Sequence, residues 1–121
     1  MEEIDLQPLR ITSGWEIEWN QFYEVDPSED MMTYFGSSSL LHVNKKHARR
    51  AINLDWSPEN DVNGYYYLRV LNLTEVINPR TKEISYDGDW DNLHYEFTSN
   101  NRLEVVKELE RLFLQVSTFK G

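Results

Sequence analysis

The sequence predicts an α+β domain: an antiparallel β-sheet of about five or six strands with one C-terminal α-helix packed on one face. Three observations predict this class. Apolar and polar residues alternate with a period of two in several short segments before Asn101. After Asn101 the apolar residues recur at helical spacing instead. No helix is expected between the strands, so parallel strands joined by helical crossovers cannot form.

Size and composition indicate a single folded unit. The 121 residues are typical of one domain, and 40% of them are hydrophobic, including 4 Trp, 7 Tyr and 5 Phe. A chain of this length buries roughly 65% of its extended-chain surface, so residues 1–121 are expected to form one globular domain with a substantial core. The chain has no cysteine, which excludes disulfide scaffolds, zinc–thiolate sites and cysteine nucleophiles.

The first clear strand is predicted over residues 14–23, where aromatic residues alternate with polar ones. Residues 9–12 are a candidate for a short strand before it, with Ser13-Gly14 as the break. One face of the predicted strand is expected to carry Trp15, Ile17, Trp19 and Tyr23, and the other Glu16, Glu18, Asn20 and Phe22.

A polar segment over residues 26–39 follows, which predicts a long loop with one helical turn at residues 29–34. Two strands are expected next, at residues 40–43 and 50–56. The second alternates, which places Ile52, Leu54 and Trp56 on one face. Residues 57–64 contain Pro, Asn, Asp and Gly throughout and predict a turn that ends in Asn63-Gly64.

Residues 65–73 form the most apolar segment and are expected to lie centrally in the sheet. A short strand is predicted at residues 83–86, between a turn at residues 78–81 and a hairpin bend at Asp87-Gly88. The last strand is expected at residues 93–97. Its alternation directs Leu93, Tyr95 and Phe97 inward.

The helix is predicted to begin near Asn101, which stands three residues before Glu104 as in a capping box, with Ser99 as a rival cap. The apolar stripe expected to face the sheet is Leu103, Val106, Leu109, Phe113 and Val116, widened by Val105 and Leu112.

Motifs of common catalytic sites are absent from the sequence. Ser37, Ser38 and Ser39 lie in no nucleophile-elbow motif, and His42, His47 and His94 have no metal-ligand spacing. Residues 87–91 (DGDWD) begin like a calcium-binding loop. However, Asn92 and Thr98 stand where that loop needs Gly and Glu. Carboxylate pairs such as Glu16 and Glu18, or Asp55, Glu59 and Asp61, arise from composition alone. We expect no enzymatic activity, no metal and no cofactor.

Charge is more informative than motifs. The chain carries 12 basic and 21 acidic residues, a net charge of −9. Four of the basic residues lie within residues 45–50, so the rest of the chain has a net charge of −13. Residues 45–50 are expected to form a solvated hairpin end. Because nucleic-acid binding needs a broad basic face, we expect no nucleic-acid partner and favour a basic protein.

The sequence predicts a cytoplasmic protein without a membrane segment. The N-terminal MEEIDLQPLR is acidic and has no apolar run of secretory length, and no stretch of 18 apolar residues occurs.

Four stretches carry a resemblance to a known family: Gly14-Trp15 with Asp26-Pro27, residues 55–66 (DWSPENDVNGYY), residues 90–93 (WDNL) and the C-terminal helix. Over roughly residues 14–117 the chain resembles small predicted immunity proteins encoded beside bacterial polymorphic toxins. Such families often have proline after the asparagine of the third stretch, where this chain has Leu93. The resemblance implies inhibition of a cognate toxin by direct binding, without catalysis or a cofactor. It implies no particular toxin and no binding residues.

The hypothesis that follows is a cytoplasmic immunity protein that neutralises a basic toxin domain, for example a nuclease. Acidic residues in loops, with neighbouring aromatic anchors, are its expected binding surface, and the strand carboxylates are less favoured. One predicted cluster is Glu24, Asp26, Glu29, Asp30 and Tyr34, and the other is Asp87, Asp89, Trp90 and Asp91.

Two other function classes stay open. A small-molecule-binding module would line a sheet pocket with Trp15, Trp19, Tyr65 and Tyr67, although core packing also explains these aromatic residues. An oligomerisation domain would expose an apolar strand edge. The sequence leaves the oligomeric state open.

Overall fold

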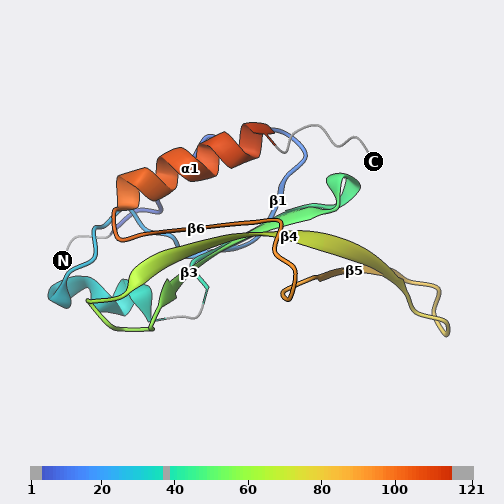
Figure 1. The fold of residues 1–121 in the computed structure, drawn as a ribbon, viewed down its shortest axis with the longest axis horizontal. Coiled ribbons are helices and arrows are strands. Elements are labelled where there is room, and N and C mark those ends of the chain that lie inside the picture. The colour runs from blue at the N-terminus through green and yellow to red at the C-terminus, as the bar shows by residue number, and fades with distance from the viewer. Residues whose placement is uncertain (1–3, 37–38, 116–121) are drawn as a thin grey trace.

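The computed structural model describes residues 4–36 and 39–115 and confirms the predicted α+β class (Figure 1). All strand pairs are antiparallel, and α1 lies across one face of the sheet. Ser37, Ser38 and Val116 lie outside the described residues. The elements are β1 (Glu16–Asn20), the 3-10 helix η1 (Glu29–Phe35), β2 (Leu41–Lys45), the 3-10 helix η2 (Lys46–Ala48), β3 (Arg50–Ser57), β4 (Tyr65–Ile77), β5 (Ile84–Gly88), β6 (Tyr95–Ser99) and α1 (Arg102–Gln115).

The central strand is β4, as predicted, and it pairs with β3, β5 and β6. The Asn72 carbonyl accepts the Asp89 N–H and the Val70 carbonyl accepts the His94 N–H, each at 2.9 Å. Carbonyls two residues apart in a strand point to the same side. Therefore β5 and β6 lie end to end along one edge of β4, and residues 89–94 form an excursion between them.

The hairpin bend predicted at Asp87-Gly88 is wrong, because both residues belong to β5 and pair with β4. The bend lies earlier, where the Asn78 N–H donates to the Glu83 carbonyl at 2.9 Å. β4 extends to Ile77, beyond its predicted end, and with β5 it projects from the body (Figure 1). On this projecting hairpin the apolar side chains Val76, Ile77 and Ile84 are exposed.

The first strand differs from its prediction. Pairing runs from Ile17–Val43 to Trp19–His42, so the register slips at Glu18. This slip breaks the alternation that the sequence pattern assumes. Ile17 and Trp19 are 52% and 45% exposed, whereas Phe22, predicted on the opposite face, is buried. Residues 9–12 form no strand, and the N-terminal segment pairs only through a bridge between Leu6 and Tyr23.

The core lies between α1 and the covered face of the sheet. Ile52, Leu54 and Trp56 are buried on one face of β3, as predicted. The Trp56 ring packs 5.0 Å from Tyr66 and 4.9 Å from Phe35 of η1, between ring centroids. Its indole N–H donates to the Asp61 carbonyl at 2.8 Å, which ties the turn after β3 to the core. Thus part of the stretch that carries the family resemblance has a structural role.

The helix begins as predicted. The Asn101 side-chain oxygen accepts the N–H groups of Leu103 and Glu104 at 2.9 and 3.2 Å. The Ser99 hydroxyl donates to the Glu104 carboxylate at 2.8 Å, so Ser99 supports the cap rather than replacing it.

The buried stripe of α1 differs from its prediction at one position. Val105, Leu109, Leu112 and Phe113 are buried, but Leu103 is 63% exposed. At about 100° per residue, Leu103 lies about 120° around the helix from Leu109, outside the face that contacts the sheet.

A substitution at the buried Leu109 therefore tests how much the packing of the helix on the sheet contributes to stability. Leu109→Ala is expected to lower the free energy of unfolding by about 2–5 kcal/mol, because it opens a cavity in the core. Leu103→Ala, the matched control on the solvent side, should change it by less than about 0.5 kcal/mol. Urea denaturation of both variants provides the measurement, and equal effects would contradict the observed orientation of the helix.

Candidate functional site

The face of the sheet opposite α1 carries a continuous chain of polar side chains. Neighbouring residues of a strand point to opposite faces, so Asn53 and Asp55 of β3 lie opposite the buried Ile52 and Leu54. The Asn53 side-chain oxygen accepts from the Ser39 hydroxyl at 3.1 Å and lies 3.0 Å from His42 Nδ1. The Asn53 amide nitrogen donates to Asp55 at 2.8 Å, and the second Asp55 oxygen pairs with Arg69 of β4.

The Asp55–Arg69 ion pair fixes the direction of this chain of hydrogen bonds. An ionised carboxylate accepts only, so Asn53 must turn its NH2 group toward Asp55 and its oxygen toward His42. That oxygen can only accept, so His42 Nδ1 carries the hydrogen. In the neutral imidazole, Nε2 is therefore a hydrogen-bond acceptor.

Aromatic rings enclose the Arg69 guanidinium on the same face. Its centre lies 4.7 Å from the Tyr67 ring centroid and 4.6 Å from that of Trp90. The Tyr67 hydroxyl donates to the Glu96 carboxylate at 2.5 Å. This hydrogen bond, together with burial, raises the pKa of Tyr67. The ion pair thus fixes Arg69, and Arg69 in turn orients Trp90.

Beside Trp90 the open face is hollowed into a groove of about 370 Å³. Its apolar side chains include the buried Leu71, and aromatic side chains come from Tyr86 and Trp90. Asn44, which is 5% exposed, also lines it, and the Asn44 side-chain oxygen is buried without a hydrogen-bond partner among the described residues. Three buried side-chain atoms in the described ranges have no hydrogen-bond partner, and of these only the Asn44 oxygen belongs to a residue that lines the groove. His42, Glu18 and Lys46 are further polar lining residues.

The first predicted binding cluster lies in and before η1, at the end of the molecule opposite the projecting β4–β5 hairpin (Figure 1), and none of its residues lines the groove. Asp26 pairs with Arg102 of α1 at 3.0 Å, and the Tyr34 ring packs 5.0 Å from Tyr23. Tyr34 is therefore half-buried and packs at the edge of the core. Glu24, Glu29 and Asp30 are exposed.

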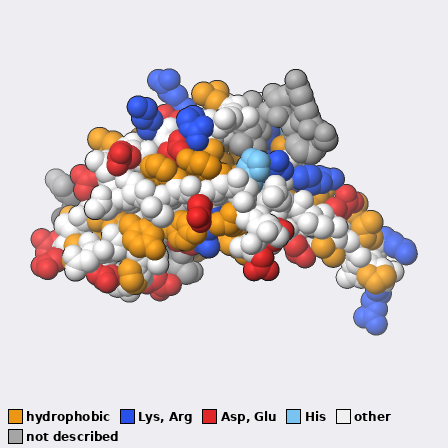
Figure 2. Space-filling view, in the orientation of Figure 1, with side chains coloured by type: hydrophobic (Ala, Val, Ile, Leu, Met, Phe, Trp, Pro, Cys, Tyr) orange, Lys and Arg blue, Asp and Glu red, His pale blue; other side chains and the backbone are white. Residues whose placement is uncertain are grey.

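The second predicted cluster lies at the junction of β5 and the excursion. Asp89 accepts the N–H groups of Asp91 and Asn92 at 3.1 and 3.2 Å, so its carboxylate stabilises the turn. Trp90 is 49% exposed and stacks on Arg69 over the open face, and Asp87 and Asp91 are exposed. Acidic side chains occur in several separate groups on the molecular surface (Figure 2).

The basic segment 45–50 spans the connection between β2 and β3, and two of its residues, Lys45 and Ala48, are buried rather than solvated as predicted. Lys45 is 1% exposed, and its ammonium lies 5.4 Å from the Trp15 ring; burial lowers its pKa. Lys46 pairs with Glu16 at 3.2 Å, and Arg49 pairs with Glu75 at 3.1 Å.

The four aromatic residues considered for a small-molecule pocket lie in different places. Trp15 packs against Phe113 of α1, with 5.3 Å between ring centroids. The Trp19 indole donates to the Ser39 carbonyl at 2.7 Å on the edge strand. Tyr65 and Tyr67 line a separate depression of about 330 Å³ with residues of β6.

Sequence reasoning missed the residues of the groove other than Trp90. His42 and Asn44 alternate with the buried Leu41, Val43 and Lys45, which could have marked a second, polar face of β2. The predicted strand ended at residue 43, so this alternation was not used. Arg69 and Tyr86 gave no signal, because their importance comes from cross-strand neighbours.

Comparison with known proteins returned no matching family model, no matching curated protein and no matching solved structure. Within residues 4–36 and 39–115, no three His, Asp or Glu side chains are grouped to hold a metal ion. Across the same ranges, no helix combines the length and the apolar content needed to span a membrane.

Breaking the Asp55–Arg69 pair should disturb Trp90 at a distance from the substitution. Asp55→Asn is expected to cost about 1–3 kcal/mol of unfolding free energy, because it leaves a partly buried guanidinium without its counter-charge. The Trp90 indole N–H resonance should shift at the same time. Asp87→Asn, at an exposed position, serves as the control, and an unchanged Trp90 resonance in Asp55→Asn would contradict the coupling.

Proposed function

We propose that this protein is an immunity protein that binds a basic toxin domain and blocks it by occupying its surface, without a catalysed step or a cofactor. The observation that carries the proposal is Trp90, which is half-exposed on the open face and held in place by Arg69. Trp, Tyr and Arg are the residues most enriched among the anchors of protein interfaces. Here all three types meet on a face that α1 leaves uncovered.

Preorganisation supports a binding role for this face. Ordering a long side chain on binding costs affinity, and a side chain already fixed in the free protein avoids most of that cost. The Asp55 carboxylate fixes Arg69, and the rings of Tyr67 and Trp90 lie against its guanidinium. The anchor therefore needs little rearrangement when a partner arrives.

Charge supports a basic partner. The chain has a net charge of −9, and Asp87 and Asp91 are exposed on either side of Trp90 in the sequence. A field of one sign raises the association rate with an oppositely charged protein. Under this proposal the protein acts in the cytoplasm, where it binds the toxin domain. It excludes nucleic acid as the principal partner.

Co-expression with the product of the adjacent gene, followed by pull-down and an assay of toxicity, tests the proposal. Immunity genes usually lie directly downstream of a toxin gene, so we expect a stable complex in which toxicity is lost. Trp90→Ala should keep the fold and weaken binding by about 30-fold or more, chiefly through faster dissociation. Leu103→Ala on the outer side of α1 is the control. A folded Trp90→Ala variant with unchanged affinity would remove Trp90 from the interface.

A small-molecule-binding module is the second candidate, and the volume of the groove favours it. A groove of about 370 Å³ with aromatic and polar lining residues falls within the size range of ligand sites. This candidate predicts a bound metabolite in native mass spectra and no dependence on the adjacent gene product.

A further inference from the structure

We propose that the groove on the open face is the binding site for one cationic side chain, an arginine or lysine, of the basic partner. The lining residues on which the argument depends are Glu18, His42, Asn44, Leu71, Tyr86 and Trp90. This inference rests on the proposed function and names the chemistry that the partner must present.

The first reason is an acceptor that lacks a donor. The Asn44 side-chain oxygen is buried and unpaired among the described residues, which is unfavourable for a strong acceptor. Asn44 is 5% exposed and lines the groove, so a cation bound there lies beside this residue and can pair with the oxygen once the amide turns toward it.

The second reason is that neighbouring polar groups are acceptors as well. The hydrogen-bond chain through Asn53 leaves Nε2 of neutral His42 as an acceptor. The Glu18 carboxylate also lines the groove, and no described side chain pairs with it. A guanidinium or ammonium group has several hydrogen-bond donors for the neutral acceptors of Asn44 and His42. Its positive charge also pairs with the Glu18 carboxylate.

The third reason is the aromatic lining. Tyr86 and Trp90 provide ring faces for a cation, and Leu71 provides an apolar surface for the alkyl stem. Both rings already contact cations of this chain: Arg49 and Lys46 lie 4.8 and 5.9 Å from the centroid of Tyr86, and Arg69 lies 4.6 Å from that of Trp90. The rings are therefore used as cation surfaces within the protein itself.

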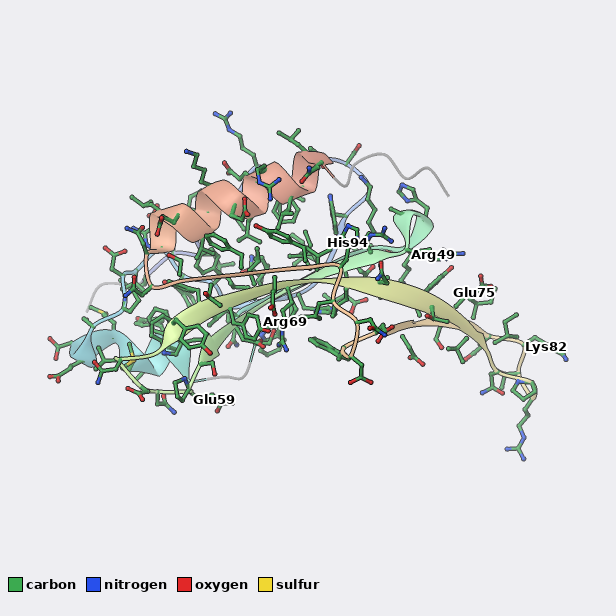
Figure 3. The ribbon with its side chains drawn as sticks, viewed as in Figure 1. Arg49, Glu59, Arg69, Glu75, Lys82 and His94 are labelled. Atoms are coloured by element: carbon green, nitrogen blue, oxygen red, sulfur yellow. The ribbon has the colours of Figure 1, made fainter. Side chains whose placement is uncertain are left out.

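The cations around the groove are compensated by their own partners. Lys46, the basic residue that lines it, pairs with Glu16 at 3.2 Å. Arg49 pairs with Glu75, its neighbour in Figure 3, and Arg69 pairs with Asp55 further into the body of the sheet. The Glu18 charge is left to attract an incoming cation.

An NMR titration of the 15N-labelled protein with blocked tripeptides tests this inference. The probe is acetyl-Gly-Arg-Gly-amide, and the matched control is the same peptide with citrulline, which keeps the shape of arginine but is neutral. We expect the arginine peptide to shift the Asn44 side-chain amide and the Trp90 indole resonance, and to bind at least about tenfold more tightly than the citrulline peptide, as expected for a charge-assisted site. Equal binding of the two peptides, shifts located elsewhere, or no shift at about 50 mM peptide would overturn the inference.

Two variants test the acceptors. Glu18→Gln and Asn44→Ala should each weaken binding of the arginine peptide by about fivefold or more. Glu18 is exposed, so Glu18→Gln is expected to fold even if Asn44→Ala does not. The control is Glu59→Gln, in the turn after β3, which Figure 3 shows toward the opposite end of the sheet from Lys82. Unchanged affinity in a folded Glu18→Gln variant would contradict the site.

The same variants separate this inference from the proposed function. If the adjacent gene product is bound and inhibited, but neither Glu18→Gln nor Asn44→Ala affects it, the cation site is wrong and the immunity function stands. If the arginine peptide binds in the groove but no toxin is bound, the site stands and the immunity function is wrong.

Discussion

A single helix can cover only one face of this sheet, and the chemistry of the other face follows from that constraint. On the covered face, β2, β3 and β4 bury apolar side chains against α1. On the open face, polar groups must contact water or one another, because an unpaired buried polar group is costly. The hydrogen-bonded chain from Ser39 to Arg69 is the result, and the Asp55–Arg69 pair fixes its direction.

This directed chain connects the fold to the proposed function. At one end it holds Arg69 against Trp90, which preorganises an aromatic anchor. At the other end it determines which nitrogen of His42 carries the hydrogen. The groove lies between these ends, and Asn44 adds a buried acceptor to it. One network thus orients both the anchor and the acceptors of the proposed binding face.

The parts of the fold that depend on local pattern could be predicted from the sequence. The alternation in β3, the apolar run of β4 and the Asn101 cap each involve residues close in the chain. The wrong predictions concern residues whose environment is set by a strand or helix distant in the sequence. The slip at Glu18 depends on pairing with β2, and the exposure of Leu103 depends on which side of the helix meets the sheet.

The proposed binding residues divide in the same way. Trp90 could be predicted because it lies among acidic residues in a segment with turn chemistry, and the structure places it on the open face. Glu18, His42, Asn44 and Tyr86 come from three different strands, so only the register of the sheet brings them together. A single sequence contains no signal for such a cross-strand set.

The most direct test is the tautomer of His42, measured by long-range 1H–15N NMR at a pH where the ring is neutral. The directed chain predicts a hydrogen on Nδ1 and a bare Nε2, with the 15N shifts typical of that form. A hydrogen on Nε2 would contradict the account, because His42 would then present a donor to the groove and the chain of hydrogen bonds would not run from Arg69 as described.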